Sequence, residues 1–78
     1  MAAPTVEEVS AVVIRVGNIP AVGADEDIFQ AGMSSVSALQ LLLELETAFE
    51  IAIPDDEFVA ARTPRDLQTM IARLSEQA

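Results

Sequence analysis

The longest stretch of this 78-residue chain without proline or glycine contains residues 35–49, where alanine, leucine, glutamine and glutamate dominate. These residue types favour a helix, so we expect one over this range. Ser34 is expected to be its N-cap, because a serine hydroxyl can accept a hydrogen bond from an N–H group of the first turn. Gly32 permits a left-handed or tightly turned backbone just before it. Ser35 is then the first helical residue, and we expect the fold to hold it out to solvent.

The apolar side chains of this helix divide into two groups when they are placed at about 100° per residue. One group spans about 100° and is expected to face the core; it contains Ala38, Leu41, Leu42, Leu45 and Phe49. The other, which we call the apolar stripe, consists of Val36, Leu39 and Leu43 and is bordered by Glu46 and Glu50. One helix of so small a domain cannot easily bury both groups, so we expect the stripe and Glu46 to bind partners. The alternative is that a third helix or a loop covers the stripe.

The composition excludes several kinds of active site. The chain has no cysteine, histidine or lysine. Disulfides, thiolate metal sites and a cysteine nucleophile are therefore excluded. Ser35 also has no histidine or lysine in this chain to activate it, so Ser-His-Asp and Ser-Lys catalysis are excluded as well. Because a phosphate-cradling glycine loop is missing too, we expect a protein that is not itself an enzyme.

Acidic residues dominate the charge: thirteen acids against four arginines give a net charge of −9. This balance argues against nucleic acid and anionic membranes as partners and favours proteins with basic patches. Three of the acids form the cluster 25–27, but an EF-hand counted from Asp25 would need glycine at Gln30 and glutamate at Val36, so no metal site is expected. We expect the cluster to face solvent and to cap a short turn through Phe29, with weak binding of a divalent ion as the alternative.

A first helix is expected over residues 6–16. Thr5 and Glu8 form a capping box at its start, apolar residues recur at helical spacing, and Gly17 is expected to end it. The recurring residues are Val6, Val9, Val12, Val13 and Val16. Residues 17–33 then form a loop that is long for a helical bundle. Its expected contacts with the core are Ile19, Pro20, Val22, Ile28 and Phe29.

Two more helices are expected after the central one. Residues 50–54 should be extended, because the proline at their end disfavours a helix before it, and Ile53 should enter the core. A short helix over 55–59 would begin with acidic residues. Thr63 as N-cap, followed by proline, predicts a last helix over 64–75 with a frayed tail. Its core face contains Leu67, Met70, Ile71 and Leu74.

Together these elements predict one all-α domain over residues 1–78. It is a four-helix bundle of three longer helices and one short helix, with a long loop between the first and second helices. No segment is long and apolar enough to span a bilayer, and no signal peptide follows Met1. We therefore expect a cytoplasmic monomer.

This arrangement resembles the acyl carrier proteins and the peptidyl or aminoacyl carrier proteins, which present a serine after a Gly-x-x step at the start of their second helix. The resemblance covers most of the chain. It is carried by Asp27-Ile28-Phe29, Gly32-Met33-Ser34-Ser35-Val36, residues 42–49, Ile53-Pro54-Asp55 and Thr63-Pro64. The glycine-serine string is a weak signal alone, but its position on a four-helix pattern of this length makes the combination specific.

The resemblance implies that Ser35 carries a 4′-phosphopantetheine arm derived from coenzyme A, whose terminal thiol holds a carboxylic-acid cargo as a thioester. The implied partners are a phosphopantetheinyl transferase, a loading ligase or synthetase, and a downstream synthase or transferase. Helix N-termini also stabilise anions such as a phosphodiester, through their free N–H groups and partial positive charge. The alternative is that Ser35 is only a second capping serine.

The chain departs from the fatty-acid carriers, which usually have Asp-Ser-Leu at the motif and an acid-rich second helix. Ser34 replaces the aspartate, and Ser37 and Gln40 stand where acids are common. The chain resembles equally the free-standing carriers of secondary metabolism, including aminoacyl and peptidyl carriers. A rival interpretation is a small helical interaction module that binds a partner helix through the apolar stripe without covalent modification.

Overall fold

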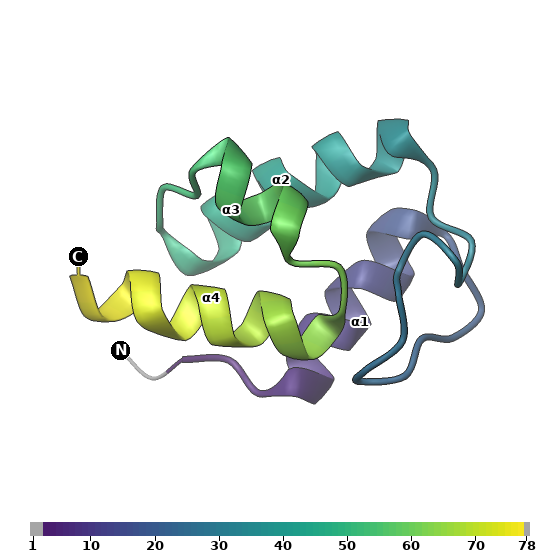
Figure 1. Ribbon diagram of the computed structural model, residues 1–78, viewed down its shortest axis with the longest axis horizontal. Coiled ribbons are helices and arrows are strands. Elements are labelled where there is room, and N and C mark those ends of the chain that lie inside the picture. Colours follow the sequence, from purple (N-terminus) through teal and green to yellow (C-terminus); the bar gives the residue numbers. More distant parts are fainter. Residues whose placement is uncertain (1–2, 78) are drawn as a thin grey trace.

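The computed structural model describes residues 3–77, which fold into four α-helices (Figure 1). The helices are α1 (Val6–Gly17), α2 (Ser35–Phe49), α3 (Asp55–Ala60) and α4 (Pro64–Gln77). α1 packs against both α2 and α4. The short α3 lies above α4 in Figure 1, where it overlaps the far end of α2 in the view. The predicted all-α fold with three longer helices and one short helix is confirmed.

The predicted helix starts are confirmed by their hydrogen bonds. The N–H of Glu8 donates to the Thr5 hydroxyl at 3.1 Å, and the N–H of Thr5 donates to the Glu8 carboxylate at 2.9 Å. The Thr63 hydroxyl accepts from the N–H of Asp66 at 3.0 Å. The predicted ends of the first and last helices are less accurate. The last helix continues to Gln77, so the tail expected after residue 75 is helical over its described part.

Gly17 does not end α1 in the way its sequence position predicts. The left-handed residue that closes the helix is Asn18, with φ of 53°. Gly17 itself is buried, and a Cβ atom there would lie 2.8 Å from the terminal methyl of Met33. A side chain at this position would therefore require the terminal methyl of Met33 to move, since a real Cβ does not approach another atom so closely. Gly32 has the expected positive φ, 121°.

The hydrophobic core joins the three longer helices to the loop. The buried residues from helices are Val9, Val13, Ala38, Leu41, Leu45, Leu67, Met70 and Ile71. Those from connections are Ile19, Val22, Ile28, Met33, Ile53 and Ala61. Leu42, Phe49 and Leu74 are only partly buried against this cluster. One expected core contact of the loop was wrong, because Pro20 is exposed, and the sequence analysis missed Met33, which is buried.

The loop between α1 and α2 is attached to the connection between α3 and α4. The N–H of Ile28 donates to the carbonyl of Arg62, and the N–H of Arg65 donates to the carbonyl of Ala24, both at 2.9 Å. Two segments distant in sequence are thus joined through their backbones. We call this attachment, together with the ion pairs described next, the loop clamp.

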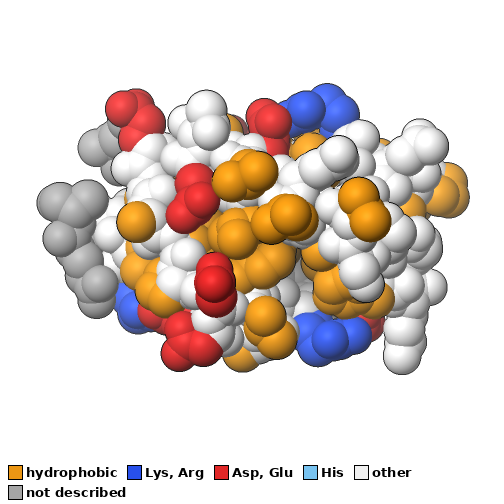
Figure 2. Space-filling view, turned by 90° about the horizontal axis from the view of Figure 1, so that it is seen from above, with side chains coloured by type: hydrophobic (Ala, Val, Ile, Leu, Met, Phe, Trp, Pro, Cys, Tyr) orange, Lys and Arg blue, Asp and Glu red, His pale blue; other side chains and the backbone are white. Residues whose placement is uncertain are grey.

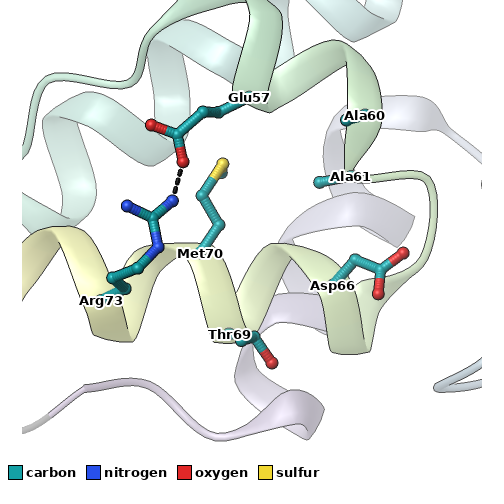
Figure 3. Close-up of a pocket in the computed structure, with 7 residues that line it drawn as sticks. All are labelled: Glu57, Ala60, Ala61, Asp66, Thr69, Met70 and Arg73. Carbon is teal, nitrogen blue, oxygen red and sulfur yellow. Dashed lines mark ion pairs between the residues drawn. The ribbon is translucent and has the colours of Figure 1, made fainter.

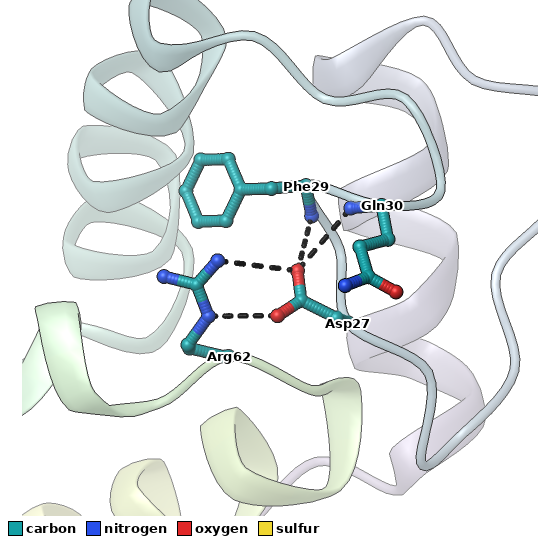
Figure 4. Close-up of polar contacts among 4 residues, drawn as sticks. All are labelled: Asp27, Phe29, Gln30 and Arg62. Atoms are coloured by element: carbon teal, nitrogen blue, oxygen red, sulfur yellow. Dashed lines mark hydrogen bonds and ion pairs between the residues drawn. The ribbon is translucent and has the colours of Figure 1, made fainter.

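Both arginines of the loop clamp also bind acids of the cluster 25–27. Arg62 donates to the two carboxylate oxygens of Asp27 at 2.7 and 3.4 Å, and Arg65 donates to Asp25 at 2.7 and 3.3 Å. Figure 4 shows the Asp27 carboxylate between the Arg62 guanidinium and the N–H groups of Phe29 and Gln30. The predicted cap on the turn is confirmed. Asp25 faces solvent as predicted, although it also pairs with Arg65, whereas Asp27 is half-buried, so the solvent-facing prediction was wrong for Asp27.

These pairs shift the protonation of the acids. Arg62, by hydrogen bonding, holds the pKa of the Asp27 carboxyl below its ordinary value of 3.8, and the N–H groups of Gln30 and Phe29 act in the same direction. Arg65 likewise lowers the pKa of Asp25. Since these carboxyls lose protons more readily in the folded chain, their stabilising contribution is present above the unfolded pKa. It is lost as the pH falls through the folded pKa.

We expect Asp27→Asn to lower the free energy of unfolding at pH 7, because it removes the charge paired with Arg62 but keeps an oxygen that can cap the turn. The deficit should shrink below about pH 4, where the wild-type carboxyl is also becoming protonated. Urea unfolding at pH 7 and at a pH below about 4 measures this difference. Asp56→Asn is the control, since Asp56 is exposed and its carboxylate has no partner within residues 3–77. An equal deficit for Asp27→Asn at both pH values would contradict the account.

Candidate functional site

The start of α2 gives its two serines different roles. The hydroxyl of Ser34 accepts a hydrogen bond from the N–H of Ser37 at 3.1 Å and lies 3.1 Å from the Ser37 hydroxyl. Ser34 is therefore the N-cap, as predicted. Ser35 is the first residue of the helix and is exposed, and its hydroxyl has no hydrogen-bond partner within residues 3–77. The side chain of Ser35 is thus available for reaction.

The charge at the start of α2 differs from that of the other helices. Each of the other three has at least one acidic residue in its first turn, whereas α2 has none. The cap from Ser34 uses the N–H of Ser37, which leaves the N–H groups of Ser35 and Val36 without a helical acceptor. An anion attached at Ser35 would meet these donors and the positive end of the helix dipole without a neighbouring carboxylate to repel it.

The apolar stripe lies open beside Ser35. Its exposed fractions are 72% for Val36, 61% for Leu39 and 56% for Leu43. Figure 2, which views the molecule from above α2, shows hydrophobic side chains gathered across this face. The alternative that a helix or loop covers the stripe was therefore wrong. Sequence analysis missed a fourth exposed apolar residue, Val59 of α3, at 69%, because only the tertiary fold brings α3 to this side of α2.

Glu46 occupies a different environment from the stripe that it was expected to border. Its carboxylate accepts a hydrogen bond from the N–H of Ile53 at 2.9 Å and is partly buried. This bond holds the connection between α2 and α3 in place. Binding of a partner by Glu46 stays a prediction, since the visible contact of this side chain is structural.

An apolar hollow of about 130 Å³ lies between α2, α3 and the loop. It is lined by Ile28, Phe29, Ala38, Phe58, Val59, Ala61 and Arg62. Ala38 lies one helical turn beyond Ser35, so the hollow is close to the start of α2. Arg62 provides the one charged side chain of the lining, and its guanidinium stacks 4.8 Å from the centre of the Phe29 ring. This hollow could not be predicted from the sequence, because its lining comes from three separate segments.

Comparison with known proteins identifies the family. Residues 5–71 match the family model described as a phosphopantetheine attachment site. A D-alanyl carrier protein of Streptococcus uberis is 49% identical over 35 residues, a segment that spans 44% of each chain. The chain thus belongs to the phosphopantetheine-binding carrier proteins, and the prosthetic group of this family is a covalently attached 4′-phosphopantetheine.

Solved structures show that the fold is shared. A peptidyl carrier protein with an active-site mutation superposes with a TM-score of 0.80 at 21% identity, over 95% of this chain and 86% of the other. A complex of the Pax NRPS, PaxA T1-CDD/PaxB NDD, gives 0.82 at 22%, over 97% and 76%. The acetyl actinorhodin acyl carrier protein of Streptomyces coelicolor gives 0.77 at 18%, over 97% and 95%. The carrier-protein fold expected from the sequence is confirmed.

The start of α2 fits such a group. Its phosphodiester needs an exposed hydroxyl for attachment and N–H donors for its charge, and both are present at Ser35. When bound, the group supplies a terminal thiol for thioester formation.

The described chain also contains no helix long and apolar enough to cross a membrane.

We expect Ser34→Ala to lower the free energy of unfolding by about 1 kcal/mol, as is typical for a lost N-cap. Ser34→Asp should retain most of the stability, because aspartate is an equally good cap. Ser10→Ala is the control for a serine within a helix, where alanine is at least as favourable. Urea unfolding of the three variants measures this. A loss from Ser34→Ala no larger than that from Ser10→Ala would show that the cap contributes little.

Proposed function

We propose that Ser35 is the residue that carries the 4′-phosphopantetheine arm and that the protein presents a carboxylic-acid cargo, as a thioester, to partner enzymes. The observation that carries this proposal is the contrast between the two serines: the hydroxyl of Ser34 is used in the cap, whereas that of Ser35 is free and exposed. The first turn of α2, without acids, supports an anionic attachment at the same residue. The chain itself performs no catalysis in this proposal, and loading and transfer are the work of enzymes in trans.

The cargo that we propose is an acyl, aminoacyl or peptidyl group of a specialised pathway or of secondary metabolism. The D-alanyl carrier protein among its relatives and the peptidyl carrier among its structural neighbours support an aminoacyl or peptidyl cargo. The acetyl-loaded acyl carrier protein among the structural neighbours supports the alternative of a simple acyl cargo. Protein from the native host, with the arm released and its acyl group weighed by mass spectrometry, would distinguish these cargoes.

The partners that we propose are a phosphopantetheinyl transferase, a loading ligase or synthetase, and a downstream synthase or transferase, each acting on a monomer. Each enzyme must approach Ser35, so the apolar stripe of α2 is the surface that it meets. Because the stripe is uncharged, recognition there should depend on apolar contact more than on ion pairs. A cytoplasmic location stays a prediction from the sequence.

The exposed stripe also supports the rival function, an interaction module that binds a partner helix without modification. The intact mass after co-expression with a promiscuous phosphopantetheinyl transferase separates the two. We expect the wild-type chain to gain the mass of one phosphopantetheine group, Ser34→Ala to gain it as well, and Ser35→Ala to remain unmodified. A wild-type chain that stays unmodified beside a competent transferase would favour the interaction module.

Substitutions of buried residues of α2 should lower stability, whereas substitutions in its exposed apolar stripe should weaken partner recognition. Leu41 is fully buried, so Leu41→Ala should lower the free energy of unfolding by about 2–5 kcal/mol. Leu39→Ala and Leu43→Ala should each change it by no more than about 0.5 kcal/mol, because their side chains are mostly in solvent. The same two substitutions should slow transfer of the arm to Ser35.

The measurement pairs a urea midpoint with the transfer rate for each variant, and Gln40→Ala, an exposed polar position on the same helix, is the control. If the Leu39→Ala and Leu43→Ala variants receive the arm as fast as the Gln40→Ala variant, the transferase does not contact the stripe.

A further inference from the structure

The four arginines of the chain all form ion pairs, but the pair of Arg62 differs from the others. The pairs are Arg15–Glu44, Arg62–Asp27, Arg65–Asp25 and Arg73–Glu57. The Asp27 side chain is the least exposed of the four acids, at 23%. Figure 3 shows that the pair of Arg73 joins two helices, α4 and α3. The pair of Arg62 instead attaches a turn of the long loop, so this arginine can affect what the loop leads to.

Arg62 contacts three consecutive residues of the loop. Its guanidinium donates to both carboxylate oxygens of Asp27 and lies 4.8 Å from the centre of the Phe29 ring (Figure 4). Its carbonyl accepts a hydrogen bond from the N–H of Ile28 at 2.9 Å. The Asp27 carboxylate in turn accepts from the N–H groups of Phe29 and Gln30. One residue of the connection between α3 and α4 thus holds the whole turn that begins at Asp27.

This turn leads directly to the start of α2. The carbonyl of Ile28 accepts a hydrogen bond from the N–H of Met33 at 3.1 Å. Ile28 and Met33 are 1% and 4% exposed, so water hardly competes for this bond. Met33 is followed by the N-cap Ser34 and then by Ser35. Two backbone hydrogen bonds therefore connect Arg62, through Ile28, to the residue two positions before Ser35.

Arg65 lacks such a connection, although it belongs to the same loop clamp. Its guanidinium binds Asp25, whose side chain is 74% exposed, and its N–H donates to the carbonyl of Ala24. The Asp25 carboxylate caps no turn within residues 3–77, in contrast to that of Asp27. Arg65 thus forms an ion pair of the same kind before the turn, which makes it a natural control.

We propose that Arg62 is a positioning residue for Ser35, which holds the start of α2 in place while a transferase attaches the arm. This role rests on the attachment proposed for Ser35. In the transfer, the Ser35 oxygen bonds to the phosphorus of coenzyme A that carries pantetheine. The bond from that phosphorus to the adenosine bisphosphate breaks and its electron pair leaves with that group, while the hydroxyl proton passes to a base of the transferase. Arg62 takes no part in these bonds.

The effect of Arg62 should therefore appear in the rate of the bound complex. A small displacement of a reacting atom slows a transfer step strongly. The apolar stripe, which a transferase meets, is unchanged when Arg62 is replaced. Substitution of Arg62 should thus lower kcat and leave the KM for the chain unaltered.

The first test is arm transfer to the unmodified chain by a promiscuous phosphopantetheinyl transferase with excess coenzyme A. We expect Arg62→Gln to lower kcat about two- to fivefold, the effect of one exposed ion pair, at an unchanged KM. The Arg62 side chain is 52% exposed, so the core should be retained. Arg62→Lys should recover only part of the rate, because lysine lacks the planar fork that binds both carboxylate oxygens. Arg65→Gln removes the same charge and an equally short pair, and should keep the wild-type kcat.

The same pair can be removed from its other side. Asp27→Asn should lower kcat by a factor similar to that of Arg62→Gln. The double variant should be no slower than either single variant, because the two side chains act as one unit. Additive losses would show that the ion pair is not the source of the effect.

Hydrogen exchange provides a second measurement that does not involve the arm. Arg62→Gln should speed exchange of the Met33 N–H about two- to fivefold relative to the Val13 N–H, whereas Arg65→Gln should not. Val13 is the reference because it is fully buried in α1 and reports unfolding of the whole domain.

The remaining outcomes overturn the proposal. An equal fall of kcat in Arg62→Gln and Arg65→Gln would assign the effect to net charge. A raised KM at an unchanged kcat would make Arg62 a contact of the transferase. Unchanged exchange at Met33 would disprove the connection through Ile28, and faster exchange at an unchanged kcat would show that transfer does not depend on it. Failure of the proposed function is seen separately, as an arm on another serine, while exchange at Met33 still tests the connection.

Discussion

Burial of Met33 against the end of α1 anchors the chain just before α2. Its terminal methyl lies close to the Cα of Gly17, and the N–H of Met33 donates to the carbonyl of Ile28 at 3.1 Å. With Met33 fixed, Ser34 turns its hydroxyl onto the first turn of α2, and Ser35 faces solvent. The exposure of the serine is thus a consequence of burying the residue two positions before it.

The surface around Ser35 depends on α3, a helix of six residues that contributes no buried residue of its own. Contacts with other elements hold α3 in place. Ala61 enters the core directly after the helix, Arg62 binds Asp27 of the loop, and Glu57 pairs with Arg73 of α4. These attachments place Val59 and the apolar hollow next to α2.

Local sequence signals predicted most of the fold and the candidate site. Capping residues, helix-favouring runs and apolar periodicity act between neighbours in the chain, so the starts of all three longer helices and the exposure of the apolar stripe could be inferred. The partners of Asp27 and Asp25 lie 35 and 40 residues away, and composition alone does not indicate which arginine meets which acid. The close contact of Gly17, the hollow and the exposure of Val59 depend in the same way on tertiary packing.

The family assignment establishes the prosthetic group, and the geometry at the start of α2 is the basis for assigning it to Ser35. Three serines lie within one turn there, namely Ser34, Ser35 and Ser37, and the account depends on the difference between them. The most direct test is fragment-ion mapping of the modified wild-type chain. The account predicts that the phosphopantetheine mass is found on Ser35 alone. The same mass on Ser34 or Ser37 would contradict it.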